Sequence, residues 1–270
     1  MYEQHWKLKV KPFENDQNTE FFYQSREHRE ALVRLLYAIM ESKGCVLLTG
    51  EPGCGKTFVL HALANELAEK KVKVAMVKNP SGDPIDLLRQ IAQTFGVRSA
   101  HAAKSELVAG IEQYLAYYRE RGIRAVLLID DADMIGNDRA YEELRLLMNL
   151  EQGGRPLLTM VLAGHPRLRS ILREIPGLSQ RIALTYAIPA LSEDESIRYV
   201  EYRLGRVNGK TDIFEDRALR EIYRASGGVP RLINHLCDLS LLVGASEGRQ
   251  VVDARVVHKA RNEFREELHQ

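Results

Sequence analysis

Short apolar runs alternate with amphipathic stretches along the chain up to residue 189. The apolar run at 45–49 is followed by glycines, which predicts a buried strand and a tight turn. Leu107, Ile111 and Leu115 recur at helical spacing, which predicts an amphipathic helix over 105–120. The same patterns predict further strands at 72–77, 124–130, 157–163 and 182–188, and further helices at 25–42, 56–70, 85–95, 138–150 and 167–173. Strands that alternate with helices predict an α/β fold with a parallel sheet covered on both faces.

After Pro189 the strand pattern stops. Helical stretches are expected at 192–206, 215–226, 230–243 and 253–266, each flanked by Gly, Pro, Ser or Asp. We therefore expect an α/β domain at 25–189 and a small all-helical domain at 190–270. Residues 1–24 are too rich in aromatic side chains for a disordered tail and are expected to pack.

Composition narrows the class of protein without identifying it. The chain is 45% hydrophobic and 28% charged, as is usual for globular proteins, and its formal net charge of +1 gives no global attraction to nucleic acid or anionic membranes. No apolar run approaches the roughly 18 residues that a membrane span needs, and the start lacks the apolar stretch of a signal peptide. Three cysteines without metal-like spacing predict reduced thiols in a cytoplasmic protein, with no direct membrane insertion.

A phosphate-binding motif follows the first predicted strand. Residues 50–57 read Gly-Glu-Pro-Gly-Cys-Gly-Lys-Thr, which matches the P-loop pattern G-x-x-x-x-G-K-T in full, between a strand and a helix. The pattern predicts that Lys56 reaches the β- and γ-phosphates of ATP and assists catalysis, and that the Thr57 hydroxyl binds Mg²⁺. The residues expected to bind nucleotide are Gly50, Glu51, Pro52, Gly53, Cys54, Gly55, Lys56, Thr57 and Phe58.

The strand predicted at 124–130 ends in two carboxylates. Asp130 is expected to hold Mg²⁺, through water, and Asp131 to orient the attacking water during ATP hydrolysis. Asp133 is an alternative for the second role, or it serves the turn into the next helix. Alone, two acids after a strand are a weak signal, but their place some 75 residues after a P-loop makes it a strong one.

With both halves of the site present, the chain resembles the AAA+ superfamily of P-loop ATPases. Within it, the chain is similar to the ExeA/GspA-type secretion ATPases and, more distantly, to the MuB/IstB-type ATPases that assist transposition. The resemblance covers nearly the whole chain. Besides the P-loop, its most specific motifs are Leu178-Ser-Gln-Arg-Ile182 and Gly227-Gly-Val-Pro-Arg-Leu-Ile-Asn-His-Leu-Cys237. It implies a three-layer α/β/α nucleotide-binding domain followed by a helical lid.

The resemblance also implies roles for single residues. His165 occupies the position of a polar sensor of the γ-phosphate, although similar proteins usually carry Gln or Asn there. Arg181 matches the arginine that enters the neighbouring subunit's site, and Arg231 matches a lid arginine that contacts ATP. Tyr23 and Phe22 match a segment that lies over the adenine. Each of these side chains could instead be an ordinary turn, surface or core residue.

The implied function is ATP hydrolysis by a homo-oligomer, of which a ring is one form, that couples energy to an envelope-associated secretion or export assembly. A DNA-binding regulator of the transposition-helper kind is the alternative, which the near-zero net charge disfavours. A slow nucleotide switch is another, because similar proteins usually have Glu where this chain has the shorter Asp131. The expected location is the cytoplasm, with the membrane's inner face reached only through partners or a further C-terminal region.

Overall fold

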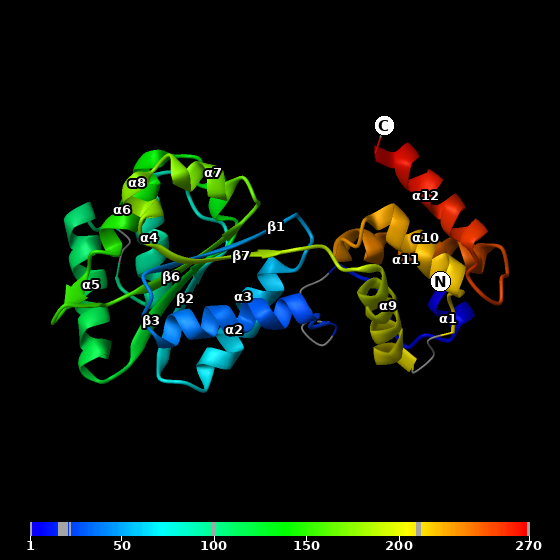
Figure 1. The fold of residues 1–270 in the computed structure, drawn as a ribbon, viewed down its shortest axis with the longest axis horizontal. Helices are drawn as coiled ribbons and strands as arrows, with labels where there is room; N and C mark the ends of the chain where they lie inside the picture. The colour runs from blue at the N-terminus through cyan, green and yellow to red at the C-terminus, as the bar shows by residue number, and fades with distance from the viewer. Residues whose placement is uncertain (1, 16–20, 22, 99–100, 209–211, 269–270) are drawn as a thin grey trace. The chain divides into compact units, whose positions relative to one another are not determined.

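The chain forms two compact units. The computed structural model describes residues 2–15, 21, 23–98, 101–208 and 212–268. One unit is Arg26–Ile188, and the other combines Met1–Ser25 with Pro189–Gln270 (Figure 1). The chain therefore passes between the units twice. The opening segment belongs to the same unit as the C-terminal helices, a connection that the sequence pattern does not predict.

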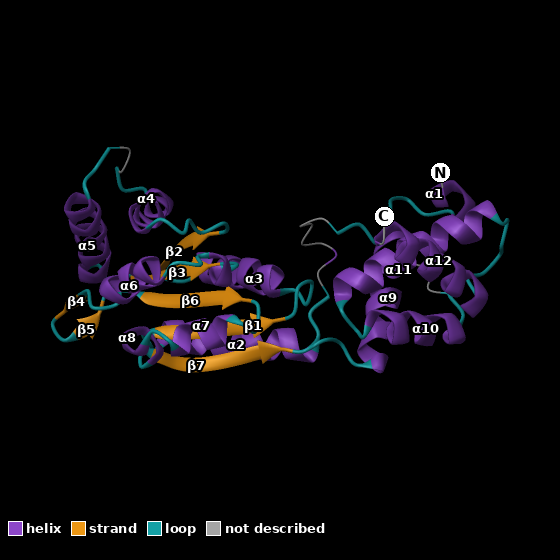
Figure 2. Cartoon of the chain, turned by 90° about the horizontal axis from the view of Figure 1, so that it is seen from above, coloured by secondary structure: helices purple, strands orange, loops and turns teal. Residues whose placement is uncertain are grey.

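The first unit is built on a five-stranded parallel sheet with the order β2-β3-β6-β1-β7 (Figure 2). Its strands are β1 (Cys45–Gly50), β2 (Val72–Val77), β3 (Arg124–Ile129), β6 (Thr159–Gly164) and β7 (Ile182–Ile188). The central strands β1, β3 and β6 are buried almost throughout, because helices cover both faces of the sheet. The predicted α/β fold with a parallel sheet is confirmed.

Helices lie on both faces of this sheet (Figure 1). On one face lie α2 (Arg26–Met40) and α3 (Lys56–Ala68). The other face carries α4 (Pro84–Phe95), α5 (Lys104–Glu120), α6 (Asp138–Leu147), α7 (Leu168–Arg173) and α8 (Pro176–Ser179). Leu107, Ile111 and Leu115 of α5 are buried in this second layer. A short antiparallel ribbon, β4 (Glu151–Gln152) with β5 (Arg155–Pro156), follows α6.

The second unit is helical, with α1 (Tyr2–Trp6), α9 (Glu193–Asn208), α10 (Asp216–Ser226), α11 (Pro230–Ser246) and α12 (Ala254–Leu268). The opening segment completes its core. The buried Trp6 donates from Nε1 to the Leu241 carbonyl at 2.8 Å, and its ring lies so close to Gly244 that an added Cβ would be 2.9 Å away. None of the helices in the described part of the chain is long and apolar enough to cross a membrane.

A buried arginine holds another part of the opening segment in the helical unit. Arg203 donates to the Tyr199 hydroxyl at 2.9 Å and to the Glu14 carbonyl at 3.0 Å. The Tyr199 hydroxyl in turn donates to Asn234 Oδ1 at 2.7 Å. Because a buried charge is costly unless it is hydrogen-bonded, these contacts tie the segment at Glu14 firmly to α9 and α11.

Candidate functional site

The glycine-rich loop lies between the end of β1 and the start of α3, as the motif predicts. Gly53 and Gly55 have φ angles of 85° and 92°, a left-handed conformation that glycine adopts without steric cost. Gly50 lies so close to the last residue of β7 that an added Cβ would be 3.0 Å from the Ile188 carbonyl oxygen. The neighbours Glu51 and Pro52 are exposed, and Phe58 lies in the first turn of α3.

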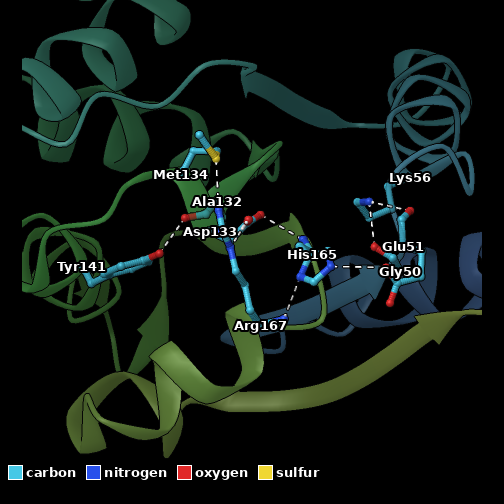
Figure 3. Close-up of polar contacts among 9 residues, drawn as sticks. All are labelled: Gly50, Glu51, Lys56, Ala132, Asp133, Met134, Tyr141, His165 and Arg167. Atoms are coloured by element: carbon cyan, nitrogen blue, oxygen red, sulfur yellow. Dashed lines mark hydrogen bonds and ion pairs between the residues drawn. The ribbon is translucent and has the colours of Figure 1, made fainter. Parts of the chain in front are cut away.

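Lys56 is folded back over this loop. It is buried, and its Nζ donates to the carbonyl oxygens of Gly50 at 2.8 Å and Glu51 at 3.2 Å (Figure 3). The ammonium group is therefore held beside the loop in which the glycine backbone turns. Such a loop at a helix start is a favourable place for phosphate oxygens. The backbone N–H groups carry partial positive charge, and the lysine ammonium carries a full one.

The two halves of the site meet at Thr57 and Asp130. The Thr57 hydroxyl donates to Asp130 Oδ2 at 2.6 Å, although the two residues are 73 positions apart. Asp130 is buried at the end of β3, where its amide donates to the Val77 carbonyl of β2. Its other oxygen accepts from the Asp131 amide at 3.0 Å. Hydroxyl and carboxylate oxygens are the ligands that Mg²⁺ prefers, so this donor pair fits the metal.

Asp131 follows directly in an unusual backbone conformation. Its φ angle is 49°, in the left-handed region that Asp and Asn enter more readily than other non-glycine residues. It is exposed at the carboxyl end of β3, next to Asp130. Asp131 thus lies at the same edge of the sheet as the P-loop.

Asp133 braces the turn that follows β6. The buried carboxylate accepts from the His165 amide at 2.9 Å and from Arg167 Nε at 2.8 Å (Figure 3). Burial alone would raise the pKa of Asp133, but these two hydrogen bonds and the Arg167 charge outweigh it and hold the pKa below its usual value. These contacts join Asp133 to the turn after β6, not to the turn into α6 that the sequence suggested, and sequence reasoning did not identify Arg167 as its partner.

His165 lies at the end of β6, facing the P-loop (Figure 3). Its Nδ1 accepts from the Arg167 amide at 3.2 Å, and its Nε2 lies 3.2 Å from Glu51 Oε2. In the neutral tautomer that this network selects, Nε2 carries the proton and donates to the carboxylate. The structure therefore places His165 beside the P-loop, where it contacts the loop residue Glu51.

His28 also contacts the loop and was missed by sequence reasoning. Its Nε2 lies 2.8 Å from the Cys54 carbonyl oxygen, and the ring is buried. Burial lowers the pKa of His28. Cys54 itself is buried inside the loop, and burial raises the pKa of its thiol. The only signal in the sequence was a histidine on the apolar face of the helix predicted at 25–42.

Arg181 is not brought to this loop. It precedes β7, where it donates from Nη1 to the Gly177 carbonyl at 2.7 Å and from Nη2 to Asn149 Oδ1. Its own carbonyl accepts from the Cys45 amide, at the start of β1. Because β1 rises about 3.3 Å per residue, Arg181 lies roughly 16 Å along the strand from Gly50.

Two predicted nucleotide contacts belong to the helical unit. Arg231 is exposed in the first turn of α11, after Gly227 and Gly228 with φ angles of 59° and 78°. Tyr23 packs against the rings of Tyr199 and Tyr202, with centroids 5.9 and 5.5 Å away. Phe22, the other candidate for the adenine, lies outside the described residues. Their contact with a nucleotide stays a prediction.

Known proteins resemble this chain over most of its length. Residues 39–172 match an AAA domain family. General secretion pathway protein A of Aeromonas hydrophila is 36% identical over 261 residues, which are 96% of this chain and 47% of that protein. The chain thus spans about half the length of this relative.

Solved structures share the fold at low identity. The ORC2 protein of Aeropyrum pernix, solved as ADPNP-ADP complexes, has a TM-score of 0.70 at 19% identity, over 95% of this chain and 72% of its own. The ORC1 protein of Aeropyrum pernix in complex with DNA has a TM-score of 0.66 at 18% identity, over 90% of this chain and 66% of its own.

Proposed function

This chain belongs to the AAA+ superfamily and is of the general secretion pathway protein A type, and on that basis we propose that it binds ATP with Mg²⁺ and hydrolyses it. One observation carries the proposal. The 2.6 Å hydrogen bond from Thr57 to Asp130 joins the P-loop to the acidic strand end. A lysine folded onto the loop, two left-handed glycines and an oxygen-only pair of metal ligands complete the set that MgATP needs.

Each residue has a separate task in this proposal. Lys56 neutralises charge on the terminal phosphates, and Thr57 with Asp130 holds the metal. Mg²⁺, when bound, would neutralise further phosphate charge. Asp131 orients and polarises the attacking water, and His165 senses the terminal phosphate through the proton on Nε2. In the structure, Glu51 is the partner of that Nε2.

Catalysis is proposed to be shared between copies of the chain. The location of Arg181 supports this, because it lies at the opposite end of β1 from the loop of its own chain. An arginine so placed can neutralise charge only on a nucleotide held by another subunit. The helical unit is proposed to act as a lid, in which Arg231 contacts the phosphates and Tyr23 lies beside the adenine.

The proposed partner is an envelope-associated secretion or export assembly, supported by the 36% identity to general secretion pathway protein A. A slow-hydrolysing switch is a second candidate, favoured by the short acid at Asp131. DNA remains the alternative partner, tested below.

The test measures ATP binding by calorimetry and phosphate release at several protein concentrations, with and without duplex DNA at low salt. Wild-type protein should bind MgATP and release phosphate, and Lys56→Ala should do neither. Lys70→Ala, which removes an exposed lysine paired with Glu66 of α3, is the matched control and should behave as wild type. No affinity for MgATP in the wild type would refute the proposal. Binding without sustained phosphate release would favour the switch, and stimulation by DNA would favour the DNA partner.

A further inference from the structure

A buried histidine supports the P-loop from the first turn of α2. His28 lies 26 residues before Cys54 in the chain, yet its Nε2 is 2.8 Å from the Cys54 carbonyl oxygen. The side chain is 5% exposed. A carbonyl oxygen can only accept, so Nε2 carries the proton and donates it. Since burial lowers the pKa of this ring, the neutral Nε2–H tautomer is the form present near neutral pH.

This contact sets the direction of a whole peptide group. The peptide between Cys54 and Gly55 is planar and trans, so its carbonyl and its N–H point in opposite directions. When the Cys54 carbonyl is held against His28, the Gly55 N–H is turned away from the ring. In a P-loop the backbone amides at these positions are the groups that bind phosphate oxygens. The histidine therefore orients one of the phosphate donors without touching the phosphate.

The ring also fills the space behind the loop. A Cβ added to Gly55 would lie 2.8 Å from His28 Nε2, closer than Cβ atoms approach other heavy atoms. Gly55 has a φ angle of 92° and directly precedes α3, so its conformation decides how the loop enters the helix. The ring and the hydrogen bond together restrict the peptide to one orientation.

We propose that His28 is a positioning residue for phosphate binding, which holds the Cys54 carbonyl and so aims the Gly55 amide at the phosphates of the nucleotide. The inference rests on the proposed function, because it concerns the same loop. It assigns a role to a residue outside both nucleotide-binding motifs. The loop should hold phosphates less tightly once the donor at residue 28 is removed, because the peptide can then rotate.

The test compares His28→Gln with His28→Met. The Gln amide nitrogen is as many bonds from Cα as Nε2 and can donate to the same carbonyl, whereas Met has similar length and no donor. Binding of MgADP and of inorganic pyrophosphate is measured by calorimetry on the full chain. We expect His28→Met to weaken both by about fivefold, the worth of one hydrogen bond, and His28→Gln to stay within about twofold of wild type. KM for ATP should rise in His28→Met with kcat unchanged, because phosphates are held in ground and transition states alike.

The outcomes separate this inference from the proposed function. If wild type binds MgATP and all variants bind equally, or if Gln and Met lose affinity equally while folded, the positioning role is refuted. If wild type binds no nucleotide, the proposed function itself fails and the inference falls with it. Should His28→Met unfold, His28→Asn replaces it, because its amide nitrogen matches Nδ1 and falls short of the carbonyl.

Discussion

Replacement of Asp133 by Asn should lower the free energy of unfolding of the α/β unit. The variant also tests whether Asp133 stabilises the turn after β6 or acts in ATP hydrolysis. The Asn side chain can still accept from the His165 amide, but its NH₂ group would then face the donors of Arg167. The lost bond joins a carboxylate that is 6% exposed to an arginine that is 56% exposed, so solvent screens one end of it. Charged hydrogen bonds contribute about 1.5–3 kcal/mol, and with this screening we expect a loss of about 2 kcal/mol.

Urea unfolding of the full chain measures this loss. Trp6 is the single tryptophan and belongs to the helical unit, so its fluorescence follows that unit, whereas far-UV circular dichroism follows both. The dichroism midpoint should fall in Asp133→Asn. Arg169→Ala removes an exposed arginine of α7 and should change the free energy of unfolding by less than about 0.5 kcal/mol. Asp133→Asn and Arg167→Ala should be non-additive by about 1 kcal/mol, because the two side chains contact each other.

The pH dependence gives the sharpest test. The folded-state pKa of Asp133 lies below the reference value of 3.8, so the carboxylate stabilises the fold above that pH and loses its effect as the pH falls through the folded pKa. The difference between wild type and Asp133→Asn should therefore be full at pH 7 and shrink below about pH 4. An equal difference at pH 7 and pH 3 would refute the reasoning. Loss of phosphate release without loss of stability would instead make Asp133 the catalytic acid.

Two further predictions address subunit sharing and the lid. Phosphate release per subunit should rise with protein concentration. Arg181→Ala should abolish phosphate release, while calorimetry shows nearly unchanged ATP affinity. Full activity of this variant would exclude a shared site. Gly228→Ala should cost more than about 3 kcal/mol by Trp6 fluorescence in urea, because φ is 78° and the new Cβ would lie 2.0 Å from the Leu191 carbonyl oxygen. Gly205→Ala in α9, where a Cβ meets nothing within 4 Å, should be neutral or stabilising, and an equal loss there would contradict this explanation.

The parallel sheet and the P-loop could be predicted because their signals are local. An apolar run, glycines and Lys-Thr stand within a dozen residues, and strand–helix alternation indicates the layers around them. The ribbon β4–β5 was not predicted, although Gly153 and Gly154, with φ angles of 59° and 70°, supply its tight turn. Each of its strands has only two residues, too few for a hydrophobic alternation to show.

The remaining parts of the site depend on contacts between distant residues. Nothing near His28 in the sequence indicates that its ring contacts Cys54, because helix α2 brings it there only when it packs beside α3. The aromatic opening predicted packing, but not that Trp6 would complete the core of the helical unit. Two roles were open for Asp133, and nothing near it in the sequence indicates that its carboxylate accepts from the His165 amide and from Arg167.

The backbone at Asp131 bears on whether the chain is a motor or a switch. The φ angle of 49° suits Asp, whose short side chain can hydrogen-bond locally in the left-handed region. Glu lacks this local hydrogen bond, so Asp131→Glu should lower the free energy of unfolding by about 1 kcal/mol. Glu would nevertheless lengthen the side chain by about 1.5 Å, which gives the carboxylate more reach for the proposed role of orienting the attacking water. We therefore expect Asp131→Glu to be less stable in urea yet to release phosphate at least about threefold faster, since general-base catalysis is worth 10²- to 10⁴-fold.

Two companion variants decide what such a result means. Asp131→Gly removes the backbone strain and the carboxylate together, so it should be no less stable than wild type and as inactive as Asp131→Asn, which should retain bound ATP. If Glu accelerates turnover while Gly and Asn abolish it, the short acid limits hydrolysis and the chain is built to hold ATP for long periods. If Asn leaves turnover unchanged, the water is activated by another group and the shortness of Asp131 has no bearing on the rate.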